Sequence, residues 1–165
     1  MWAIKAISLL YILILPIAAT AVEGPADDQS QLQAGYVDGA ALYRLGDGDW
    51  IPLKKGRSLE RGMELRVLDG TSVELLSSSG NLKIGSRGPA RMLLYPEAGS
   101  GAGAIVSLEY GHFAIFTPVA SPATSTVVTP LGKAEFYRGT ASVSTDGKEE
   151  VKLAAAAGTA CLFVR

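Results

Sequence analysis

The sequence predicts an all-β protein. Short runs rich in Val, Leu, Ile, Tyr and Phe recur at intervals of roughly 8 to 12 residues, and Gly, Pro, Asp or Ser separates them. Helical periodicity is nearly absent, and the segment MELRV at 63–67 alternates strictly between apolar and charged residues. A chain of 165 residues, of which 48% are hydrophobic and 19% charged, fits one ordinary globular domain.

Residues 1–21 have the pattern of a signal peptide. One lysine precedes an apolar run from Ala6 to Leu15, and Ala19-Thr20-Ala21 supplies the small residues expected before a cut after Ala21. The alternative is an uncleaved anchor helix, but the run is shorter than the roughly 20 residues that cross a bilayer, and Pro16 interrupts it. We therefore expect a periplasmic or secreted protein that has no membrane span after cleavage.

The all-β domain is expected to begin near Ala34, after a polar and flexible leader at 22–33, and to continue to residue 165. Its clearest strand is 63–67. Asp69 and Gly70 form a pair that favours the positive φ angles of a tight hairpin turn. This strand and the run TSVELL that follows it are therefore expected to form a hairpin. The next predicted strands are LKIG at 82–85 and RMLLY at 91–95.

Two connections in the second half are predicted to lie on the surface. The segment 96–104 is rich in glycine but opens an alternating strand, which favours a flexible loop over a phosphate-binding turn. The segment 117–126 contains prolines that are excluded from central strands. Because loops on a rigid scaffold often carry binding, these segments are the expected contacts with a partner. The residues concerned are Gly99, Ser100, Gly101, Gly103, Thr124, Ser125 and Thr126.

The remaining apolar runs predict further short strands, each ended by a turn or a glycine step. These strands are expected at 105–110, 113–116, 125–129, 133–137, 141–145, 149–154 and 159–164. Ala154 to Ala157 has high helix propensity and could instead form one short helical turn. Gly139 lies between two strand-like runs, where a residue without a Cβ permits a turn or a close chain approach.

The order of these motifs resembles the FecR domain family. The resemblance is carried by AGYVDGAA (34–41), LERGMELRV (59–67), LDGTSVELL (68–76), LEYGHFAIF (108–116) and VVTPLGKAEFYRGTASV (127–143). Within them we assign a structural motif to Gly111, Thr129, Pro130, Gly132, Gly139 and Thr140. The resemblance implies a β-helical or roll-like domain that contacts other molecules outside the cytoplasm; a β-sandwich is the alternative.

The namesakes of this family are periplasmic parts of regulators that relay the occupancy of an outer-membrane iron-siderophore receptor to a sigma factor. Such regulators carry a cytoplasmic domain and a membrane span before this module and a small signalling domain after it. We expect neither in this chain, so direct contact with a sigma factor is not expected. Ala141-Ser142 also stand where the family usually places a bulky residue.

Charge and residue types argue against several classes of function. The chain has 15 basic and 16 acidic residues and a net charge of −1, so no positive field attracts nucleic acid. Its single histidine, His112, is expected in a turn or on the surface and has no recognisable catalytic partner, and Cys161 is expected to be an inert apolar residue. One His and one Cys cannot form a structural zinc site, and no cofactor is expected.

We therefore expect a non-catalytic exported protein that binds or scaffolds another envelope protein, or that is associated with signalling. The alternative is a protein that acts on the cell wall or on polysaccharide, because catalytic carboxylates distant in sequence would leave no motif.

Overall fold

The computed structural model describes residues 32–77, 82–94, 104–117 and 125–164, and all regular structure in these ranges is β-strand, which confirms the all-β prediction. The strands are β1 (Leu32–Asp38), β2 (Ala41–Leu45), β3 (Ile51–Pro52), β4 (Ser58–Leu59), β5 (Met63–Val67), β6 (Ser72–Ser77), β7 (Lys83–Leu94), β8 (Ala104–Thr117), β9 (Ser125–Thr129), β10 (Gly132–Thr145) and β11 (Val151–Val164). The described residues include no helix that could cross a membrane.

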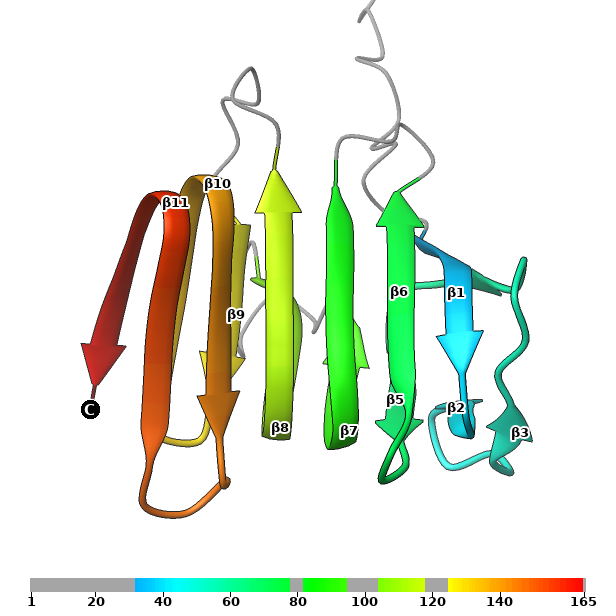
Figure 1. Cartoon of the computed structure of the whole chain (residues 1–165). Helices are drawn as coiled ribbons and strands as arrows, with labels where there is room; N and C mark the ends of the chain where they lie inside the picture. Colours follow the sequence, from blue (N-terminus) through cyan, green and yellow to red (C-terminus); the bar gives the residue numbers. More distant parts are fainter. Residues whose placement is uncertain (1–31, 78–81, 95–103, 118–124, 165) are drawn as a thin grey trace, which may run out of the picture.

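Four long strands, β7, β8, β10 and β11, bend and take part in two layers (Figure 1). The front layer contains β1, β6, residues 83–87 of β7, 111–117 of β8, 139–145 of β10 and 151–157 of β11. The back layer contains β3, β2, β5, residues 90–94 of β7, 104–110 of β8, β9, 132–136 of β10 and 158–164 of β11. The result is roll-like, since hydrogen bonding continues from one layer into the other.

Apolar side chains from both layers fill the space between them. Strand β5 shows why, because its alternation places Met63, Leu65 and Val67 inward, where each is at most 4% exposed, and turns Glu64 and Arg66 outward. The largest fully buried side chains among the described residues are Phe113 of β8 and Phe136 of β10, one from each layer. Burial of these alternating residues is the main source of stability expected for such a domain.

The bends correct the sequence-based boundaries. Predicted pairs of short strands at 82–85 and 91–95, 105–110 and 113–116, 133–137 and 141–145, and 149–154 and 159–164 are single bent strands. The alanine run at 154–157 continues β11, so the alternative of a helical turn is wrong. Each interrupting glycine turns the chain without ending its hydrogen bonding, and Gly111, Gly139 and Gly158 have φ of 110°, 94° and 89°.

Strands β10 and β11 are joined by a tight turn at 146–150. Oδ1 of Asp146 accepts hydrogen bonds from the backbone N–H groups of Lys148, Glu149 and Glu150 at 2.9 to 3.0 Å. The bonds from Glu150, Lys148 and Glu149 stabilise the carboxylate and lower the pKa of Asp146 to about 2. This turn fixes the register in which β11 begins its pairing with β10.

Candidate binding surfaces

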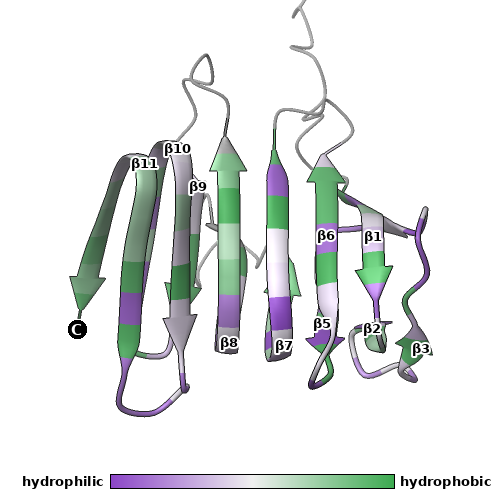
Figure 2. Cartoon of the chain, in the orientation of Figure 1, coloured by the Kyte–Doolittle hydropathy of each residue, from purple (hydrophilic) through white to green (hydrophobic). Residues whose placement is uncertain are grey.

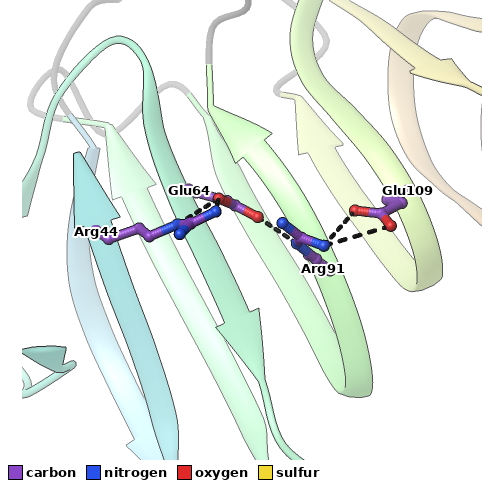
Figure 3. Close-up of polar contacts among 4 residues, drawn as sticks. All are labelled: Arg44, Glu64, Arg91 and Glu109. Atoms are coloured by element: carbon purple, nitrogen blue, oxygen red, sulfur yellow. Dashed lines mark hydrogen bonds and ion pairs between the residues drawn. The ribbon is translucent and has the colours of Figure 1, made fainter. Parts of the chain in front are cut away.

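A row of alternating charges crosses the outer side of the back layer (Figure 3). It comprises Arg44 of β2, Glu64 of β5, Arg91 of β7 and Glu109 of β8. Arg44 Nη2 lies 2.6 Å from Glu64 Oε2, Arg91 Nε donates to Glu64 Oε1, and Arg91 Nη1 lies 3.2 Å from Glu109 Oε2. The row therefore links four strands through charge-assisted hydrogen bonds.

Glu64 is the centre of this row and is 16% exposed in its side chain. Burial alone raises the pKa of Glu64, but hydrogen bonds and attraction from Arg91 and Arg44 outweigh burial and hold the pKa below its usual value. Arg44 is also positioned by Trp50, whose ring centroid lies 4.6 Å from the guanidinium carbon. The two arginines therefore favour the ionised form of the Glu64 carboxylate.

A groove adjoins the charged row on the same outer side. We call it the back groove; its lining residues are Glu64, Arg91, Met92, Leu93, Ser107, Leu108, Glu109, Val128, Thr129 and Pro130. Its walls combine the ionic groups with the partly exposed side chains of Leu93 of β7, Ser107 of β8 and Val128 of β9. Such a combination of apolar surface and fixed polar groups is typical of a recognition site.

A second groove lies on the outer side of the front layer. We call it the front groove; its lining residues are Tyr36, Asp38, Ser72, Val73, Glu74, Gly85, Ser86, Arg87, His112 and Ala114. His112 also lines a smaller hollow beside the bend of β8, together with Ser144, Thr145 and Asp146 of the neighbouring strand and turn. His112 is therefore shared by two concave surfaces.

His112 is a strand residue, which corrects the expectation of a turn. It pairs with Arg87 of β7 and Ser144 of β10, directly after the bend at Gly111. Its Nδ1 is buried and has no hydrogen-bond partner in the structure. Burial, followed by the positive charge of Arg87, lowers the pKa of His112 and favours the neutral imidazole. A buried ring nitrogen without a partner is unusual and marks a place where a bound group could supply one.

The structural-motif residues occupy bends and one turn. Gly111 and Gly139 lie at the bends of β8 and β10, and Thr140 follows in β10 opposite Ala157. Thr129, Pro130 and Gly132 belong to the turn between β9 and β10, where the Thr129 hydroxyl donates to the Gly132 carbonyl at 3.1 Å. Of this set, Thr129 and Pro130 also line the back groove.

The predicted binding loops fall mostly outside the described residues. Gly99, Ser100, Gly101, Gly103 and Thr124 lie there. Ser125 and Thr126 are not loop residues but belong to β9, opposite Phe136 and Glu135, and Ser125 is 6% exposed.

Sequence reasoning missed both grooves because their residues come from strands distant along the chain. Only the alternation of Glu64 and Arg66 with apolar residues signalled an outward-facing side, and nothing signalled which strands would be neighbours. No group of three or more His, Cys, Asp or Glu side chains among the described residues could hold a metal ion. No family model, curated protein or solved structure matches this chain.

Proposed function

We propose that this chain is a non-catalytic binding module, exported to the cell envelope, that resembles FecR domains and recognises another envelope protein. The observation that carries this proposal is the back groove beside the charged row. The carboxylate of Glu64 forms ion pairs with Arg44 and Arg91, so the charged groups at the edge of the groove are already oriented before a partner binds. Preorganised polar groups beside an apolar wall favour recognition of an extended protein segment.

The groove is lined mainly by residues of paired strands, which hold its lining side chains in fixed positions for a partner. Leu93, Ser107 and Val128 belong to neighbouring strands β7, β8 and β9, and each is partly exposed on the outer side. A partner segment that contacts them would bury apolar surface while its polar groups meet Arg91 or Glu109 at the rim.

A pull-down from an envelope extract, with the protein as bait, tests this assignment. Val128→Arg places a long charged side chain in the back groove, and we expect it to abolish capture of the partner. Ala114→Arg is the matched variant, because Ala114 is a partly exposed strand residue that lines the front groove instead. It is expected to capture normally. Both variants must keep the melting temperature of the unmodified protein; capture that survives Val128→Arg and is lost in Ala114→Arg would contradict the proposed site.

The front groove favours one second candidate, which is polysaccharide binding. Tyr36 of β1 is 51% exposed and lies opposite Glu74 of β6, and Asp38, Arg87 and His112 line the same groove. An aromatic face next to several hydrogen-bonding groups suits a sugar ring, which has an apolar face and a rim of hydroxyls. Co-sedimentation with isolated cell-wall polysaccharide that is lost in Ala114→Arg but not in Val128→Arg would favour this candidate.

Export is a separate expected result. Because small residues at 19–21 follow a short apolar run, the protein purified from the envelope or the medium is expected to begin at Val22. Intact-mass measurement together with N-terminal sequencing checks this. A membrane-bound product that retains Met1 would contradict the signal-peptide assignment.

A further inference from the structure

Strand β11 is a long sheet edge with little protection against further pairing. It pairs with β10 over Val151 to Val164, and no described strand pairs with its other side. Of these 14 residues only Lys152 is charged, and none is proline. Figure 2 shows mainly hydrophobic residues along this strand. Proteins usually protect such edges with charges, prolines or short strands, and their absence here indicates an interaction surface.

The opposite end of the roll is closed by the chain itself. The segment between β2 and β5 crosses from the back layer, where β3 pairs with β2, to the front layer, where β4 pairs with β1. Its Leu53 and Leu59 are 5% and 0% exposed and cover that end of the core. The edge strands there are only two residues long, and β3 includes Pro52. This end is unsuited to pairing with β11 of another copy.

The core is less completely covered along β11. Its inward-facing residues Val151, Leu153, Ala160 and Leu162 pack against the core but are only partly buried, whereas Phe136 and Val143 of β10 are at most 2% exposed. At the end of the strand, Phe163 and Val164 are 45% and 65% exposed. A partner that extends both layers would remove this apolar surface from water.

The bend restricts which partner can pair along all of β11. The strand turns from the front layer to the back layer at Gly158, and β10 bends beside it at Gly139, which lies opposite and also has a positive φ. A straight strand could extend one layer only. A partner that pairs with both layers must bend at the matching position, and β11 of a second copy does so.

We propose that this chain forms a two-fold dimer in which the β11 strands of two copies pair around their bends. The two-fold axis runs parallel to the strands and passes through the bend, so Gly158 lies opposite Gly158 of the second copy. The front-layer part of each β11 is then antiparallel to the back-layer part of the other. The dimer leaves both grooves accessible, because both lie on the outer sides of the layers.

The register of this pairing follows from the existing ladder. Between β10 and β11 the register shifts after Thr140, so that Ala156 is the extra residue in the ladder. The same shift in the dimer keeps inward side chains opposite inward side chains. It pairs Val151, Leu153 and Ala155 with Val164, Leu162 and Ala160 of the second copy.

The outward side chains are also compatible in this register. Lys152 lies opposite Phe163 of the second copy, so the two lysines do not meet. Phe163 already accepts Lys133 over its ring at 5.0 Å in the same chain, which shows that its face can receive an ammonium group. Ala154 lies opposite Cys161 of the second copy.

Sedimentation equilibrium and a designed cross-link test the dimer and its register. The full-length chain is expressed, and the product that accumulates is purified; we expect twice the single-chain mass at micromolar concentration. In Ala154→Cys the new thiol is expected to form a disulfide with Cys161 of the second copy after mild oxidation with diamide, giving a covalent dimer on a non-reducing gel. Ile51→Cys, an exposed position on the opposite edge, is the matched control and is expected to remain unlinked.

A third variant tests the edge without a cross-link. Ala155→Lys places an inward-facing charge at the exposed edge and is expected to give a monomer with an unchanged β-sheet circular dichroism spectrum. A monomeric unmodified protein would overturn the proposal. A dimer that cross-links through Ile51→Cys rather than Ala154→Cys would also overturn it, because that pattern indicates head-to-tail stacking.

Discussion

Replacing Gly139 with alanine is expected to lower the free energy of unfolding by about 3–5 kcal/mol, the sum of backbone strain and a steric overlap in a packed region. Gly139 has a backbone φ of 94°, a value that residues other than glycine rarely adopt. A Cβ at this position would also overlap the carbonyl oxygen of Ala157 in β11. Relief of that overlap requires β10 and β11 to separate at their bends. Urea denaturation followed by circular dichroism measures the change.

Gly56→Ala separates the two causes. Gly56 has φ of 86°, close to that of Gly139, but nothing lies within 4 Å of its added Cβ. This control is therefore expected to lose about 1 kcal/mol, from backbone strain alone. Equal losses in the two variants would show that the close approach of β11 at the bend does not contribute.

The fold class followed from the sequence because side-chain alternation is a local property. In 63–67 the period of two identifies both the strand and its buried side without knowledge of any neighbour. The bends could not be read in the same way, since a glycine that ends a strand and a glycine that folds a strand over look alike. Gly139 and Gly158 face each other across β10 and β11. That coincidence, visible only in three dimensions, distinguishes a bend from a break.

The grooves were beyond the sequence for a related reason. Arg44, Glu64, Arg91 and Glu109 are spread over four strands, and their contacts depend on strand order. The sequence shows His112 as the single histidine, but its position between Arg87 and Ser144 follows from the pairing of β8 with β7 and β10. A sequence pattern indicates which side chains face outward, but long-range register determines which of them meet.

Glu64→Gln is expected to lower the free energy of unfolding at pH 7 by about 1.5–3 kcal/mol, the range for hydrogen bonds to charged groups. The amide keeps the size of the side chain but removes the charge that holds Arg44 and Arg91 together. Glu74→Gln is the matched control, because Glu74 has one ionic partner among the described residues, Lys83 at 2.7 Å, and the pair is more exposed. That control is expected to lose less than about 1 kcal/mol.

The pH dependence of the loss distinguishes the charge of Glu64 from its packing. Because the pKa of Glu64 is lower in the folded protein than its ordinary value of 4.5, the carboxylate stabilises the fold fully above that value. This stabilisation is lost as the pH falls from 4.5 toward the folded pKa, where protonation removes the charge from the unmodified protein as well. The difference between the unmodified protein and Glu64→Gln is therefore expected to shrink on acidification, measured by urea denaturation in steps from pH 7 to pH 3. A difference that stays constant over this range would mean that Glu64 stabilises the sheet by its shape and neutral hydrogen bonds, and that the row in Figure 3 is not held by charge.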